Sequence, residues 1–242
     1  MNEDDIRLRL LAGVPVKLDN VGEIQPPTLK EIISIGGDLH NHYLSSLLFD
    51  KKALENHEEI EHDTFAIFLS LCINDEVFRD LVYKALEMYF TEKPNYQEGF
   101  FYFGEIEEER VLVGDAFYEM QQVLKIANNM AEEEEKKFAN DKARKLWEKI
   151  QKKKKEAEKY SKSGVDLHSL LSGVIWRSSK PRSEILESTI YQLYDGYFRL
   201  QNIDQYDHTY LGIYTGNVDG EKMKKELPKI NWAAKINLED NK

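Results

Sequence analysis

The segment from residue 131 to residue 163 differs from the rest of the chain and limits how the chain can fold. It consists mostly of Glu, Lys and Ala, and its few apolar anchors are Phe138, Leu146, Trp147 and Ile150. Its 12 basic and 8 acidic residues give it a net charge of +4, so the remainder of the chain carries −15. Such a composition buries no broad face and predicts an exposed helix or a partly ordered linker. We therefore expect three parts: an α-rich N-terminal domain (1–130), this charged helical linker (131–163) and a helical C-terminal domain (164–242).

The linker also contains the cluster Lys152–Lys155. A solvated helix end and a contact with a phosphate or an acidic partner both explain it.

The N-terminal part begins with patterns of a short helix and a β-hairpin. An amphipathic piece spans residues 6–11, and apolar alternation predicts strands at 14–18 and 21–24 around a turn at 19–20. Thr28 followed by Glu31 predicts a capping box at the start of a helix. Gly36-Gly37 predicts a kink or a break in that helix, because each glycine costs about 1 kcal/mol relative to alanine.

Helical recurrence continues through most of the N-terminal part. Helices are expected to start at 63–64, after a turn at 74–75, and around Phe117. The period changes between residues 99 and 113, where two β segments are expected at 101–106 and 110–113 around an acidic turn.

The C-terminal part carries an apolar stripe and many aromatic residues. The stripe consists of Leu186, Ile190, Leu193, Tyr197 and Leu200, whose steps of four and three place them on one helix face. Asp166 predicts the cap of a preceding helix, Pro181 fits the first turn of the striped helix, and residues 205–214 are expected to form a further helical piece. The predicted fold class is mainly α, with small β-hairpins in the N-terminal part.

The aromatic residues of this part allow two interpretations. They can form a core with several helical neighbours, or they can form a protein-binding surface, since Tyr and Trp offer a large contact area with one polar group. The candidate partner-binding residues are Trp176, Tyr191, Tyr194, Phe198, Tyr206, Tyr210, Tyr214 and Trp232. Tyr191 and Phe198 fall off the stripe, so the sequence places a partner on their face of the helix.

Composition excludes several classes of protein. The chain has 242 residues with 41% apolar and 11% aromatic residues, which is typical of a folded protein with a real core. Its net charge of −11 argues against a general nucleic-acid binder. The first residues do not resemble a secretory signal, and no apolar run approaches the roughly 18 residues of a membrane span. We expect a cytoplasmic protein that binds neither nucleic acid nor membrane.

No pattern of residues predicts catalysis, a metal or a cofactor. The sequence His40-Asn41-His42 lies within one expected helix, whereas a nuclease of the HNH type spreads these residues over a ββα site. His57 and His62 are five apart and so diverge by about 140° on a helix, which does not fit a zinc motif. No serine lies in a nucleophile elbow, and the single cysteine, Cys72, lies in an apolar run. We therefore expect no catalytic, cofactor-binding or metal-binding residues, and no enzyme.

Several short motifs resemble tail assembly chaperones of phages and prophages of Gram-positive bacteria. In the C-terminal part the motifs are Trp176-Arg177-Ser178, residues 189–196 (TIYQLYDG) with Arg199-Leu200, residues 212–217 (GIYTGN) with Asp219, and residues 230–233 (INWA). In the N-terminal part they are residues 11–16 (LAGVPV) and 27–32 (PTLKEI), and the Glu/Lys-rich middle is also similar. The resemblance covers most of the chain, through packing and turn motifs rather than a catalytic signature.

The resemblance implies a protein of the host cytoplasm that coats the helical tape measure protein and recruits tail tube subunits. It also allows self-association, and a short or a frameshifted long form. Two other functions stay open at this point: a structural tail component of the virion, and a phage protein that engages a host defence or regulatory protein.

Overall fold

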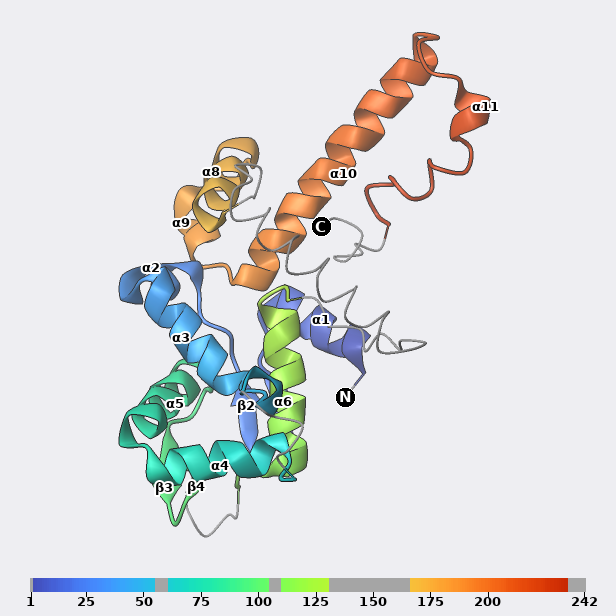
Figure 1. Cartoon of the computed structure of the whole chain (residues 1–242). Coiled ribbons are helices and arrows are strands. Elements are labelled where there is room, and N and C mark those ends of the chain that lie inside the picture. Colours follow the sequence, from blue (N-terminus) through green and yellow to red (C-terminus); the bar gives the residue numbers. More distant parts are fainter. Residues whose placement is uncertain (1, 55–60, 105–109, 131–165, 235–242) are drawn as a thin grey trace. The chain divides into compact units, whose positions relative to one another are not determined.

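The computed structural model describes residues 2–54, 61–104, 110–130 and 166–234 (Figure 1). The chain divides into two compact units, of which the first combines residues 1–131 with 180–242 and the second spans 132–179. The described residues form ten α-helices and two antiparallel β-hairpins, so the predicted mainly α fold with small hairpins is confirmed. The predicted linker, 131–163, lies outside the described residues, and the predicted domain boundaries stay a prediction.

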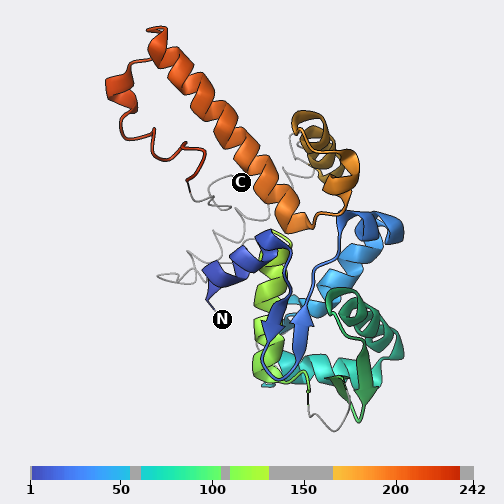
Figure 2. The ribbon, with the colours of Figure 1, turned by 180° about the vertical axis from the view of Figure 1, so that it is seen from behind.

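The first unit begins with a helix and a hairpin. Helix α1 (Glu3–Ala12) ends at Gly13, whose positive φ of 70° suits a residue without a side chain. Strands β1 (Val16–Leu18) and β2 (Gly22–Ile24) pair antiparallel around Asn20, which has a φ of 56°. Figure 2 shows these strands beside helix α6 (Gly114–Ala127), and β1 contacts that helix. The predicted N-terminal hairpin is thus present.

The next two helices confirm both local predictions made from the sequence. Helix α2 (Leu29–Ile35) starts with a complete capping box, in which the Thr28 amide donates to the Glu31 carboxylate at 2.8 Å and the Glu31 amide donates to Oγ1 of Thr28. Helix α3 (Gly37–Leu47) follows after a break at Gly36, where φ is 91°. The paired glycines therefore end one helix and start another.

Helices α4 (Thr64–Asn74) and α5 (Glu76–Tyr89) follow a 3₁₀ turn, η1 (Lys51–Ala53). Their N-caps are the side chains of Asp63 and Asp75, which accept from amides of the first turn. Both starts lie where the sequence predicted them. Helix α5 packs on α3 and on α4.

The second hairpin differs from the prediction. Strand β4 (Phe100–Phe103) pairs with β3 (Pro94–Gln97), whereas the sequence analysis paired it with residues 110–113. The reason is the turn Glu98-Gly99, where both residues have positive φ, 53° and 90°, as a tight two-residue hairpin turn requires. Residue Val111 joins Tyr102 through an isolated bridge only, and helix α6 (Gly114–Ala127) follows.

The core of the first unit is rich in phenylalanine. Phe68 and Phe117 lie 4.7 Å apart between ring centroids, and both side chains are fully buried. Two of the buried polar side chains beside this core, Gln121 and His40, join separate elements. Nε2 of Gln121 donates to the carbonyls of Leu47 and Phe49, which satisfies groups left open at the end of α3.

The buried side chain of His40 also joins separate elements, because its Nε2 lies 2.8 Å from the hydroxyl of Tyr89. That hydroxyl donates to Oδ1 of Asn128, so it accepts from His40. Burial lowers the pKa of His40 and raises that of Tyr89. The pair therefore links α3, α5 and the end of α6 in neutral form.

The C-terminal helices begin with α8 (Leu167–Arg177), in the second unit, capped by Asp166 as predicted. Helices α9 (Arg182–Leu186), α10 (Ile190–Tyr214) and α11 (Gly220–Met223) belong to the first unit. The predicted striped helix is interrupted, because Thr189 caps a new helix and leaves Leu186 in α9. The predicted separate piece at 205–214 is instead the second half of the 25-residue helix α10, whose sequence contains no proline.

Candidate partner-binding surface on the C-terminal helices

The histidine and cysteine side chains that the structure describes do not form a metal site. The described residues contain no group of three or more His, Cys, Asp or Glu side chains placed to hold a metal ion. His57 lies outside the described residues, and His40 is buried against Tyr89. Burial raises the pKa of Cys72 to about 12, which keeps its thiol protonated and unreactive.

The described helices include none with the length and hydropathy that a bilayer crossing requires. A pocket between α1, β1 and α6 has a volume of about 20 Å³, enough for roughly one water molecule.

The start of α10 is fixed to α1 by one glutamine. Thr189 and Gln192 form a capping box, in which the Thr189 amide donates to Oε1 of Gln192 at 3.0 Å. The Nε2 of the same glutamine donates to the carbonyl of Leu11 at 3.0 Å, near the end of α1. Sequence analysis missed this residue, although the spacing Thr-x-x-Gln is the same signal that revealed the capping box at Thr28.

The start of α10 is also fixed to α2. Thr28 and Thr189 form an isolated antiparallel bridge, and the Leu29 amide donates to the carbonyl of Ser188 at 2.8 Å. Outside this bridge, Lys30 and Glu187 form an exposed ion pair at 2.8 Å. Residues of the segments 11–16, 27–32 and 189–196 thus meet where the start of α10 docks on α1 and α2.

Tyr191 and Phe198, the two residues chosen for a partner, are buried within the chain. Their side chains are 9% and 8% exposed. Tyr191 belongs to the main core and forms a hydrogen bond with Arg7 of α1; burial raises its pKa, and the hydrogen bond opposes that rise. Contacts inside the chain therefore occupy both side chains, and their role in binding a partner stays a prediction.

The other candidate aromatic residues are more accessible. Tyr206, Tyr210 and Tyr214 follow at steps of four along the second half of α10, with successive ring centroids 4.5 and 6.3 Å apart. The hydrogen bond with Tyr210 raises the pKa of Tyr206. Tyr214 is 83% exposed, whereas the other two are half-buried. These three residues are called the tyrosine ridge below.

The remaining candidates differ in their exposure and in the unit that carries them. Tyr194 is half-buried and stacks on Phe198 with centroids 6.1 Å apart. Trp176 is 81% exposed on α8, in the second unit, and Trp232 is 55% exposed near the end of the described chain. Among these candidates, the ring contacts join Tyr206, Tyr210 and Tyr214 in the ridge and join Tyr194 with Phe198.

After α10 the chain turns back along the helix. Gly216 has a φ of 74°, and Val218 lies against Gly212. The guanidinium of Arg199 then donates to the carbonyls of Trp232 and Ala234, the latter at 2.9 Å. Sequence analysis missed this role of Arg199, since nothing local signals which carbonyls a long side chain will reach.

Residues 152–237 match the family model of the YomV second domain, from a phage- and prophage-associated family. The match includes α8 to α11 and therefore the tyrosine ridge. It indicates a phage-associated protein without assigning a role in the phage. No curated protein and no solved structure matches the chain.

Proposed function

We propose that the protein is a phage tail assembly chaperone, which binds the tape measure protein and recruits tail tube subunits without catalysing a reaction. The observation that carries the proposal is the second half of α10. This helix lies within the range that matches a phage-associated family, and it leaves Leu211 and Tyr214 exposed at 59% and 83%.

Such a surface suits a partner that also exposes apolar helix faces. The tape measure protein, as the family resemblance implies, is a long helical protein that displays such faces before the tube closes around it. Tyrosines present broad apolar contact with one hydroxyl that can stay hydrated, so the contact can form and later be released. The work would take place in the host cytoplasm, ahead of tube assembly.

Co-expression with the tape measure protein of the same phage tests the proposal. The wild-type chain should keep the tape measure protein soluble and co-purify with it. Substituting Tyr210→Ser together with Tyr214→Ser should reduce the recovered complex severalfold. The matched control is Tyr118→Ser, which removes an exposed tyrosine of α6 outside the ridge. Absence of co-purification with the wild-type chain would reject the proposal.

Purified virions separate this function from a structural one. A chaperone is absent from finished particles, whereas a structural tail component is present in stoichiometric amount by mass spectrometry. A phage protein that engages a host defence or regulatory protein would instead leave tails intact when its gene is deleted and alter phage survival in particular hosts.

A further inference from the structure

The two glycines within helix α10 have different surroundings. A Cβ added to Gly212 would lie 2.7 Å from Cγ2 of Val218, so the chain after the helix packs where a side chain would stand. At Gly196, no described atom outside the glycine's own helix backbone and its chain neighbours lies within 4 Å of such a Cβ. Glycine is less favourable in a helix interior than any residue except proline. Packing among the described residues therefore explains Gly212 and does not explain Gly196.

The residues before Gly196 fix α10 to the N-terminal helices. The Nε2 of Gln192 donates to the carbonyl of Leu11 at 3.0 Å. The side chain of Tyr191 forms a hydrogen bond with Arg7 and belongs to the main core. The first turns of α10 are thus held both by hydrogen bonds and by core packing.

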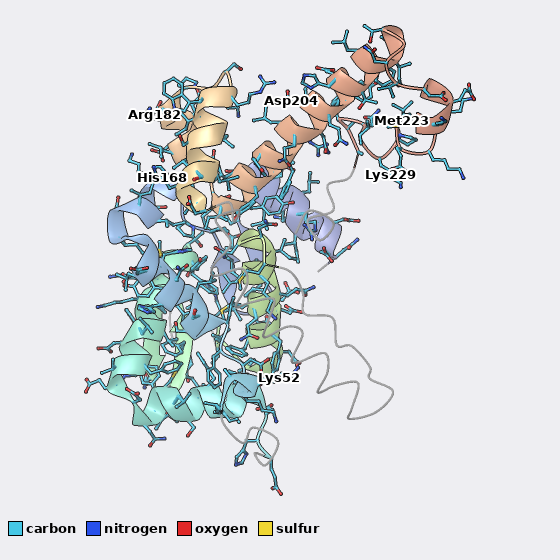
Figure 3. All side chains as sticks on the ribbon, turned by 45° about the horizontal axis from the view of Figure 1, so that its top comes forward. Lys52, His168, Arg182, Asp204, Met223 and Lys229 are labelled. Atoms are coloured by element: carbon cyan, nitrogen blue, oxygen red, sulfur yellow. The ribbon has the colours of Figure 1, made fainter. Side chains whose placement is uncertain are left out.

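Beyond this glycine, the contacts given above join α10 to the segment that follows it, residues 215–234, called the returning segment below. The guanidinium of Arg199 donates to two carbonyls of this segment, and a valine of the segment packs on Gly212. Figure 3 labels Asp204 on this part of α10 and Met223 on the returning segment. The unexplained glycine therefore stands between a part of α10 attached to the N-terminal helices and a part attached to the returning segment.

A side-chain contact that crosses the glycine lies on the opposite face of the helix. Tyr194 and Phe198 stack with ring centroids 6.1 Å apart. At about 100° per residue, each lies roughly 160° around the helix from Gly196. The pair Asp195 and Arg199 also spans the glycine, but its charged atoms are 4.0 Å apart and such partly exposed pairs contribute little. The helix can therefore open on the glycine face while the stacked rings stay in contact.

Opening on this face affects two backbone hydrogen bonds. In an α-helix the amide of Gly196 donates to the carbonyl of Gln192, and the amide of Leu200 donates to the carbonyl of Gly196. Because glycine has no side chain that shields these bonds, water reaches them more easily than elsewhere in the helix. Water inserted between such groups is a known cause of helix kinks.

We propose that α10 contains a hinge at Gly196. About this point the second half of the helix, with the tyrosine ridge and the returning segment, bends relative to the docked first turns. The ridge then meets a partner from more than one direction while the start of α10 stays in place. The hinge is a property of the chain alone and does not depend on the proposed function.

Amide hydrogen exchange of the full chain provides the local test. Fraying from the end of α10 gives protection that falls steadily from Leu200 to Asp207. A hinge gives instead a minimum at Leu200, with Asp207 better protected. Gly196→Ala should slow exchange at Leu200 about fivefold, because alanine favours the closed helix by that factor. A steady fall in the wild-type chain, or unchanged exchange at Leu200 in the variant, would overturn the proposal.

Distances between two spin labels provide the global test. The labels are attached at Glu119→Cys in α6 and Leu211→Cys in the second half of α10, both exposed positions. The native Cys72 is buried and stays unlabelled. The distribution of distances should be broad in the doubly labelled chain and narrower when Gly196→Ala is added. Equal widths with and without this substitution would count against a hinge and overturn the proposal.

Gly37→Ala is the matched control for both measurements. A Cβ at Gly37 likewise has no described atom within 4 Å, but this glycine begins helix α3. The control should leave the exchange at Leu200 and the width of the distance distribution as in the wild type. The same slowing and narrowing in the control would assign the effect to overall stability and overturn the proposal. Because no partner is present in either measurement, a rigid α10 rejects the hinge and leaves the proposed function standing.

Discussion

The N-terminal core and the second half of α10 differ in the exposure of their aromatic side chains. Tyr89 is fully buried, and its hydroxyl is bonded to both His40 and Asn128. Tyr214 is 83% exposed, at the end of a helix. The core tyrosine, Tyr89, is held by hydrogen bonds to side chains on other helices. The tyrosines of the ridge contact one another along the same helix. The difference separates residues that maintain the fold from residues that the fold leaves exposed.

The largest effect should come from the phenylalanine cluster. Phe68→Ala removes a ring that lies 4.7 Å from Phe117 and 6.0 Å from Phe78 between centroids. The free energy of unfolding should fall by about 3–5 kcal/mol, because the loss of buried apolar surface and the cavity left behind both destabilise the folded state. Denaturant unfolding measures it. A loss below about 1 kcal/mol would show that this region is less tightly packed than its burial indicates.

A smaller loss is expected where a buried amide holds the end of a helix. Gln121→Ala leaves the carbonyls of Leu47 and Phe49 without their donor, which should cost about 1–3 kcal/mol. Gln122→Ala is the matched control, because the neighbouring side chain is half-buried and points elsewhere on α6. Equal losses in the two variants would contradict the role given to Gln121.

The buried histidine should make the stability of the core depend on pH. The folded state lowers the pKa of His40, so below about pH 6.5 the unfolded state binds a proton that the folded state does not. The free energy of unfolding should therefore decrease as the pH falls below 6.5, by at most about 1.4 kcal/mol per pH unit, and become flat below the folded pKa.

Thermal or denaturant unfolding between pH 7.5 and roughly pH 5 measures this decrease. His40→Gln should lose it, whereas His42→Gln, an exposed neighbour on α3, should keep it. A variant at position 40 with the same pH dependence as the wild type would assign the effect to other groups.

The smallest effect on stability is expected at the open end of α10. Tyr214→Ala should change the free energy of unfolding by no more than about 0.5 kcal/mol, as is usual for exposed residues. The same substitution should nevertheless weaken recovery of the tape measure protein. A loss of stability comparable to that of Phe68→Ala would remove the distinction between core and surface on which the proposed function depends.

Local signals in the sequence predicted most of the secondary structure. Some signals act within one turn of helix and can be recognised in the sequence without knowledge of the fold. They are Thr28 with Glu31, the glycines at 36–37, and the caps Asp63 and Asp75. Strand β3 escaped notice because Pro94 is typical of a helix end, although Glu98-Gly99 marked the hairpin.

The surface was harder to predict than the elements. Tyr191 and Phe198 were selected because they lie off one stripe, but a helix near a core is buried on more than one side. Contacts such as Lys30 with Glu187, 157 residues apart, depend on the whole fold. Tyr214 is exposed because no other described element covers its side chain, and the local sequence does not show which side chains will be covered.

The joint at the start of α10 also has a consequence for synthesis on the ribosome. The carbonyl of Leu11 receives its bond from Gln192, 181 residues later. At about 5–20 residues per second, that partner emerges roughly 9–36 s after Leu11 is made. During this interval the carbonyl of Leu11, at the end of the first helix, lacks the donor that it has in the folded chain. The contact between α1 and α10 forms only after Gln192 has been synthesised. The segment that bears the tyrosine ridge is therefore synthesised after the helices on which the start of α10 docks.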